Sequence, residues 1–142
     1  AGFSEPLVSL NLKSRNVRWR VDAGGVQAPL VSGREIFHGG ADGKLRKVDA
    51  ITGSVGWTWE CPEGGTLGLP VKTPAGLLVA SSEGSLYLIS AKDGSTLWTY
   101  RPGHRLAGIT AGVAVDGRQA VVVTNAGNVI SLIVPQRSQD DE

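Results

Sequence analysis

The sequence predicts an all-β fold built from β-propeller blades, with about three blades in the chain. Three segments, 28–50, 69–91 and 112–134, align without internal gaps at shifts of 41 and 43 residues. In each segment two apolar runs flank a glycine-containing turn, which is the pattern of a β-hairpin. Because four short strands in about forty residues are typical of a propeller blade, the repeat predicts a propeller that is incomplete within this chain.

Each complete repeat is expected to hold four antiparallel strands. In the unit over 26–59, the apolar runs predict strands at 28–32, 35–39, 44–48 and 55–59. The hairpin turns of the three copies share a glycine, at Gly43, Gly84 and Gly127. Glycine adopts a positive φ at no steric cost, so we expect these residues to serve the turn.

A tryptophan recurs near the end of the repeat. Trp19, Trp57 and Trp98 each follow a leucine by twelve residues. A large ring at one position in every repeat is expected to pack between neighbouring sheets. We therefore predict that Trp57 and Trp98 are buried between blades. Trp19 lies next to an incomplete unit and is expected to contribute less to stability.

The repeat boundaries divide the chain into a partial propeller over 1–135 and a polar tail over 136–142. The expected parts are the last two strands of a blade over 7–21, a blade over 26–59, a blade over 67–100 and three strands over 109–134. Propellers usually close with about four to eight blades, so closure within this chain is not expected. Open sheet edges predict pairing with further blades, with another protein or with a second copy.

The connection before each tryptophan carries a motif. It comprises Asp49, Ala50, Thr52, Gly53 and Trp57 in one copy, Ser90, Ala91, Gly94 and Trp98 in the next, and Asn11 and Trp19 in the partial copy. The Asp or Asn side chain can accept backbone N–H groups of the turn, and the glycine supplies a left-handed residue. The motif resembles the D-A-x-T-G-x-x-x-W tryptophan-docking motif of the pyrroloquinoline quinone (PQQ) type propeller repeat family. The resemblance implies blades joined by docked tryptophans, and it does not specify a function.

The PQQ-type repeat occurs in two functional classes. One includes the propeller lipoprotein of the outer-membrane β-barrel assembly machinery, and the other is the quinoprotein dehydrogenases. Resemblance to the dehydrogenases would imply a vicinal cysteine pair beside the cofactor, a catalytic Asp and calcium ligands. Cys61 is the only cysteine, so such a pair cannot form, and the aspartates at 42, 49, 93 and 116 fit turn chemistry. We therefore expect no catalytic residue, no metal ligand and no bound cofactor.

The two histidines do not form a catalytic set. His38 lies in an apolar strand where the other copies have Val79 and Val122, so we interpret it as a hydrogen-bonded strand histidine rather than a metal ligand. His104 lies beside Arg105 in the connection over 101–110. This connection and the one over 60–68 vary most between repeats, which makes them the expected partner-contact surfaces, with His104 and Arg105 as contact residues.

Composition narrows the classes of partner. The net charge of +1 gives no electrostatic reason to expect a nucleic-acid partner, and the basic run at 15–20 is interpreted as a solvated edge. No apolar stretch of 18 residues is present, so direct membrane insertion is not expected. The sequence favours a non-catalytic interaction scaffold in the periplasm or cell envelope. The alternative is a fragment of a PQQ-dependent quinoprotein dehydrogenase whose active site lies in other blades.

Overall fold

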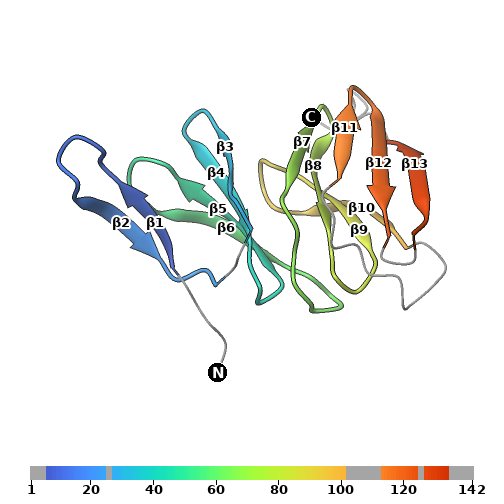
Figure 1. Ribbon diagram of the computed structural model, residues 1–142, viewed down its shortest axis with the longest axis horizontal. Helices are drawn as coiled ribbons and strands as arrows, with labels where there is room; N and C mark the ends of the chain where they lie inside the picture. Colours follow the sequence, from blue (N-terminus) through green and yellow to red (C-terminus); the bar gives the residue numbers. More distant parts are fainter. Residues whose placement is uncertain (1–5, 25–26, 102–112, 125–126, 135–142) are drawn as a thin grey trace.

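The computed structural model describes residues 6–24, 27–101, 113–124 and 127–134, and the regular structure of these residues consists of β-strands. The strands form four antiparallel sheets that follow one another in chain order along the long axis of the molecule (Figure 1). The predicted all-β class and the four-stranded blades are therefore confirmed.

The sheets contain two, four, four and three strands, and we call them blades 1 to 4. Blade 1 comprises β1 (Leu7–Leu10) and β2 (Val17–Val21). Blade 2 comprises β3 (Leu30–Ser32), β4 (Glu35–Gly39), β5 (Lys44–Asp49) and β6 (Val55–Glu60). Blade 3 comprises β7 (Val71–Thr73), β8 (Gly76–Ala80), β9 (Leu86–Ile89) and β10 (Thr96–Tyr100). Blade 4 comprises β11 (Ala114–Asp116), β12 (Gln119–Val123) and β13 (Val129–Ile133).

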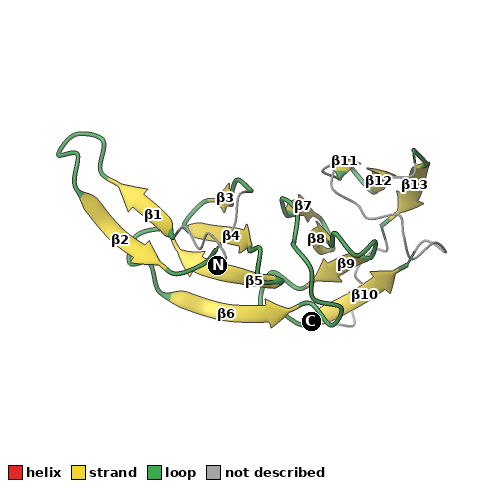
Figure 2. Ribbon diagram, turned by 60° about the horizontal axis from the view of Figure 1, so that its bottom comes forward, coloured by secondary structure: helices red, strands yellow, loops and turns green. Residues whose placement is uncertain are grey.

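Each complete blade is a meander in which every strand pairs with the next. Figure 2 shows the blades set along an arc, with the last strands β6 and β10 on its convex side and the first strands β3 and β7 on its concave side. The arc is open. This arrangement is that of an incomplete propeller, as the repeat count predicts.

The hairpin glycines have the expected backbone. Gly43, Gly84 and Gly127 have φ values of 75°, 103° and 85°. At Gly43 the constraint is also steric, because an added Cβ would lie 3.0 Å from the carbonyl oxygen of Gly65 in the following connection. The shared glycine therefore serves both the turn and the close approach of a neighbouring segment.

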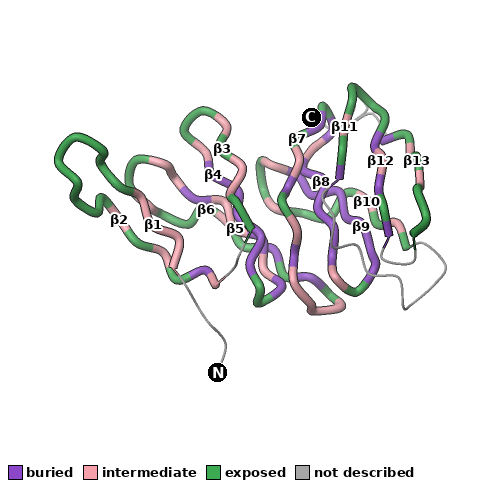
Figure 3. The backbone as a smooth tube through the Cα atoms, in the orientation of Figure 1, coloured by how far each residue is buried: buried purple, intermediate pink, exposed green. Residues whose placement is uncertain are grey.

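The hydrophobic core lies between blades, in two clusters that share blade 3. One face of blade 2 supplies Phe37, Leu45 and Trp59, which pack with Leu77, Val79, Tyr87 and Ile89 of blade 3. The opposite face of blade 3 supplies Leu78, Ala80, Leu86 and Leu88, which pack with Ala120 and Val122 of blade 4. Figure 3 shows this burial concentrated in β4, β8 and β9. Alternating strand residues thus join blade 3 to both of its neighbours. Within the described residues, no helix has the length and apolar character needed to cross a membrane.

Candidate functional site

The turn after β5 is built by the motif residues at 49–53. Asp49 Oδ1 accepts hydrogen bonds from the backbone N–H groups of Ile51 and Thr52 at 2.8 and 3.0 Å. These two hydrogen bonds lower the pKa of Asp49, and Arg34 lowers it further. Gly53 closes the turn with a φ of 76° and donates its N–H to the Asp49 carbonyl at 2.8 Å. The turn thus ends on a residue without a side chain.

Trp19 of blade 1 docks on this turn of blade 2. Its Nε1–H donates a hydrogen bond to the Ala50 carbonyl oxygen at 2.9 Å. The ring lies against Gly53 so closely that an added Cβ would be 2.7 Å from Trp19 Cγ. The glycine is therefore required twice, for its positive φ and for the ring that covers it.

The same docking recurs between blades 2 and 3. Trp57 Nε1–H donates to the Ala91 carbonyl oxygen at 3.2 Å, and an added Cβ on Gly94 would lie 2.7 Å from the Trp57 ring. Ser90 replaces the aspartate of the motif, and its Oγ has no hydrogen-bond partner among the described residues. Asp93 instead accepts the Ser95 N–H at 3.0 Å. In both pairs a tryptophan docks on the turn of the blade that follows it in the chain.

Trp57 and Trp98 pack against the clusters between blades, but both residues are half-buried rather than buried as predicted. The buried ring is Trp59, at 6% exposure. Its Nε1–H donates to Thr96 Oγ1 of blade 3 at 2.9 Å, and its ring packs on Tyr87 with the centroids 4.9 Å apart. Trp59 lies nearer the core end of β6 than Trp57. In the sequence, the burial of Trp59 is indicated by its spacing of two residues from Trp57, which places both on the same strand face.

The structure also revises the expected ranking of Trp19. Trp19 makes the same hydrogen bond and the same glycine contact as Trp57, so its neighbouring incomplete unit does not weaken its docking. Trp98 stacks on Tyr100 with ring centroids 5.8 Å apart and packs against the core shared with blade 4. The repeat places its docking turn at 133–137, which lies mostly outside the described residues.

The connection at 61–68 is packed against the blades. Its predicted role in partner contact assumed a loop that is free from packing. Cys61 and Leu67 are buried, and Leu67 forms an isolated β-bridge with Ser81. Cys61 N–H donates to the Gly43 carbonyl at 2.8 Å, which ties the connection to the hairpin turn of blade 2. The segment therefore fastens blade 2 to blade 3.

An ionic cluster extends this fastening. The Tyr87 hydroxyl donates to the Glu63 carboxylate, which also pairs with the Arg101 guanidinium. Burial alone would raise the pKa of Glu63, but hydrogen bonds from Ser85 and Tyr87 and the Arg101 charge lower it. Burial and the neighbouring carboxylate raise the pKa of Tyr87. A carboxylate held ionised and a phenol held neutral stabilise the interface, and neither is poised to transfer a proton at neutral pH.

His38 lies in β4, as predicted, at 3% exposure. Burial and then the Arg46 charge lower its pKa, so the ring is neutral at pH 7. The expectation that it is fully hydrogen-bonded is not met, because Nδ1 has no partner among the described residues. The part of the chain that the structure describes contains no group of three or more His, Cys, Asp or Glu side chains arranged to hold a metal ion.

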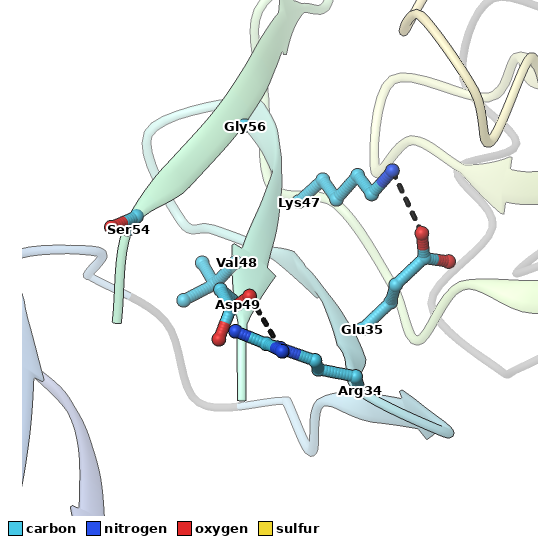
Figure 4. A pocket seen from close by; sticks show the side chains of 7 residues that line it. All are labelled: Arg34, Glu35, Lys47, Val48, Asp49, Ser54 and Gly56. Atoms are coloured by element: carbon cyan, nitrogen blue, oxygen red, sulfur yellow. Dashed lines mark hydrogen bonds and ion pairs between the residues drawn. The ribbon is translucent and has the colours of Figure 1, made fainter. Parts of the chain in front are cut away.

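A polar groove of about 370 Å³ opens on blade 2 near the docking turn (Figure 4). It is lined by Arg34, Glu35, Lys47, Val48, Asp49, Ser54 and Gly56. Its charges are paired: Arg34 Nε lies 2.9 Å from Asp49 Oδ2, and Lys47 Nζ lies 2.8 Å from Glu35 Oε1. The groove thus combines two neutralised ion pairs across β4 to β6, and it presents no nucleophile with an adjacent base.

The predicted contact residues His104 and Arg105 lie outside the described residues. Of the connection at 101–110, the structure describes Arg101, which serves the ionic cluster with Glu63. The described features that recur from blade to blade are therefore the docking turns and the tryptophans that cover them.

Residues 2–132 match the family model described as "Outer membrane protein assembly factor BamB". The chain belongs to this family. The match spans all four blades, and the docking motif quoted above recurs in three of them. A search of curated proteins gave no match to this chain.

Solved structures agree with the BamB-family fold. The crystal structure of BamB from Moraxella catarrhalis superposes with a TM-score of 0.76 at 19% identity, covering 92% of this chain and 41% of that one. The crystal structure of the computationally designed Ika8 protein gives 0.68 at 15% identity, covering 84% of this chain and 37% of that one. The chain thus spans about two fifths of either relative. At these identities the likeness shows the fold alone.

Proposed function

We propose that this chain is part of a non-catalytic scaffold that presents propeller surfaces to protein partners in outer-membrane protein assembly, in the periplasm or cell envelope. Membership of the BamB family supports the assembly role. The observation that carries the non-catalytic role is the use made of the carboxylates. Asp49 holds a turn, Asp42 pairs with Arg46, Glu35 pairs with Lys47, and Glu63 pairs with Arg101. Carboxylates already engaged in a turn or in ion pairs, within a blade or between blades, are poor general acids and bases.

An uncovered sheet face supports the need for a partner. Leu45 and Leu86 hold equivalent positions in blades 2 and 3 and are 0% and 1% exposed, because the following blade covers them. The equivalent Val129 in blade 4 is 69% exposed. This face, with Val121, Val123 and Ile133, is proposed to pack against a further blade, another protein or a second copy.

The connection at 101–110 is proposed as a second contact surface, with His104 and Arg105 as the residues that a partner reads. The test is co-purification of the tagged chain with the outer-membrane β-barrel assembly machinery from a detergent-solubilised envelope fraction. Replacing His104 and Arg105 together with alanine should weaken recovery of the machinery. The matched control, Arg118→Ala, changes an exposed arginine in the turn between β11 and β12 and should leave recovery unchanged. Equal recovery with every variant would remove His104 and Arg105 from the contact surface.

The second candidate function is a fragment of a quinoprotein dehydrogenase, and the PQQ-type motif at 49–57 is the observation that favours it. In that case the catalytic groups would lie in blades beyond this chain. Dye reduction that requires both quinone and calcium, measured with the longer protein that this candidate requires, would favour this candidate and overturn the scaffold proposal.

A further inference from the structure

The turn between β1 and β2 keeps the backbone of a docking turn. Asn11 Oδ1 accepts the N–H groups of Lys13 and Ser14 at 2.9 and 3.1 Å, as Asp49 does in its own turn. Arg15 N–H donates to the Asn11 carbonyl at 2.7 Å and takes the left-handed conformation with a φ of 61°. The turn therefore folds like its counterparts in blades 2 and 3.

Its side chains differ at the two positions that receive a tryptophan. Leu12 replaces the alanine whose carbonyl accepts the indole hydrogen bond, and Arg15 replaces the glycine under the ring. At Gly53 a single Cβ atom would already lie 2.7 Å from the docked ring. Because Arg15 carries a complete side chain there, no tryptophan can dock on this turn in the same way. A tryptophan docked in the manner of Trp19 therefore does not cover this turn.

The accessible surface is apolar and cationic. We define the hairpin tip as residues 10–18. Leu10, Leu12 and Val17 are exposed, with Leu12 at 88%. Lys13, Arg15 and Arg18 are also exposed, and none of the three forms an ion pair within the described part of the chain. No Asp or Glu occurs between residues 6 and 21. The tip is a local cationic site on a chain whose net charge is only +1.

The tip also projects. Figure 1 shows the turn between β1 and β2 at the extreme end of the molecule, beyond the rest of the arc, and Figure 3 shows it exposed along its length. A projecting tip that exposes an apolar side chain beside cationic ones suits a flat anionic surface.

We propose that the hairpin tip is a peripheral contact site for an anionic lipid bilayer. Leu12 lies at the boundary between headgroups and acyl chains, while Lys13, Arg15 and Arg18 lie among the lipid phosphates. No segment of the chain crosses the bilayer in this arrangement. Each cation near an anionic surface strengthens partitioning about fivefold, and the burial of Leu12 adds to this. This inference is independent of the scaffold proposal, since it concerns a different surface and a different partner.

The test is co-sedimentation of the full chain with vesicles. The probe is phosphatidylcholine mixed with phosphatidylglycerol, and vesicles of pure phosphatidylcholine serve as the neutral comparison. The chain should sediment with the anionic vesicles, and added salt should release it. Lys13→Gln with Arg15→Gln should weaken partitioning about twenty-five-fold, and Leu12→Ala should weaken it about fivefold.

Two control variants make the test specific. Lys92 holds the position equivalent to Lys13 in the turn of blade 3, so Lys92→Gln removes the same charge from a turn that receives a docked ring. It should leave partitioning within about twofold of the unaltered chain. Arg15→Gly restores the motif residue, so it should raise folding stability while weakening vesicle binding about fivefold.

Loss of binding without loss of fold, in Arg15→Gly, would support the proposal most directly. Equal binding to neutral and anionic vesicles would overturn it, as would an equal effect of Lys92→Gln and the double replacement. If the tip instead contacts an acidic protein, neither kind of vesicle will sediment the chain, and that result also overturns the lipid proposal.

Discussion

Replacing Gly53 with alanine should destabilise the fold far more than the same change in an open turn. Gly53 has a φ of 76°, and an added Cβ would meet the Trp19 ring at 2.7 Å. Gly117 also has a positive φ, of 58°, but nothing lies within 4 Å of its Cβ position. The two variants therefore share the backbone strain and differ in the clash with a docked ring.

The difference can be estimated from the contacts. The left-handed conformation costs an alanine about 1 kcal/mol, and this is the whole expected effect of Gly117→Ala. In Gly53→Ala the ring must also move away, which breaks the Trp19 hydrogen bond to Ala50, worth about 1 kcal/mol, and exposes part of the indole. The expected total is about 3 kcal/mol. The free energy of unfolding from urea titration measures both variants.

A double-mutant cycle isolates the ring. With Trp19 already replaced by alanine, Gly53→Ala should cost only about the 1 kcal/mol of Gly117→Ala, because no ring remains to be displaced. If Gly53→Ala and Gly117→Ala cost the same in the unaltered background, the tryptophan does not dock as described, and the reasoning fails.

The contacts between blades give four further predictions. Trp19→Ala and Trp57→Ala should each lower the free energy of unfolding by about 2 to 4 kcal/mol and by similar amounts, and a negligible loss for Trp19 would restore the ranking predicted from sequence. Trp59→Phe should cost about 1 kcal/mol less in a Thr96→Val background than in the unaltered chain, because the hydrogen bond to Thr96 is already absent there. The pKa of Glu63 is below its ordinary value of 4.5. The contribution of Glu63 to folding stability is therefore present above pH 4.5 and is lost as the pH falls through the folded-state pKa. The urea midpoint of Glu63→Gln should accordingly depend less steeply on acid pH than that of the unaltered chain. The pKa of Tyr87 is raised above its ordinary 10.0, so its contribution is present below that pH and is lost as the pH rises beyond it, and Tyr87→Phe should remove this alkaline dependence.

The repeat made most of the fold predictable. The strand predicted at 35–39 coincides with β4, and those predicted at 44–48 and 55–59 each end one residue before the observed strand. The sequence predicts the first strand at 28–32, whereas β3 begins at Leu30. Short edge strands lose pairing at their ends. Local spacing carries this information, since hydrophobic periodicity and glycine turns act within a few residues.

Burial between blades was less predictable. The sequence alone placed Trp57 at the interface but could not rank it against Trp59, because both occupy the same strand face. The depth of burial depends on which residues of the next blade lie opposite. The residues that contact Trp59, Thr96 and Tyr87, are 37 and 28 residues away from it in the sequence. The packing of the connection over 60–68 depends in the same way on distant partners, since Cys61 bonds to Gly43 and Leu67 bridges to Ser81.

The changed turn in blade 1 shows what a repeat comparison can add. The sequence identifies Asn11 and Trp19 as the two motif residues kept in blade 1. The effect of Leu12 and Arg15 can be inferred only from the structure, which shows that the Trp19 ring covers the equivalent Ala50 and Gly53 of blade 2.

The central claim is that this chain acts by binding a protein partner. Its most direct test is biolayer interferometry with the purified chain immobilised and the purified outer-membrane β-barrel assembly machinery in solution. We expect saturable binding that weakens when His104 and Arg105 are both replaced with alanine and is unchanged by Arg118→Ala. Absence of saturable binding to the unaltered chain would contradict the proposed function.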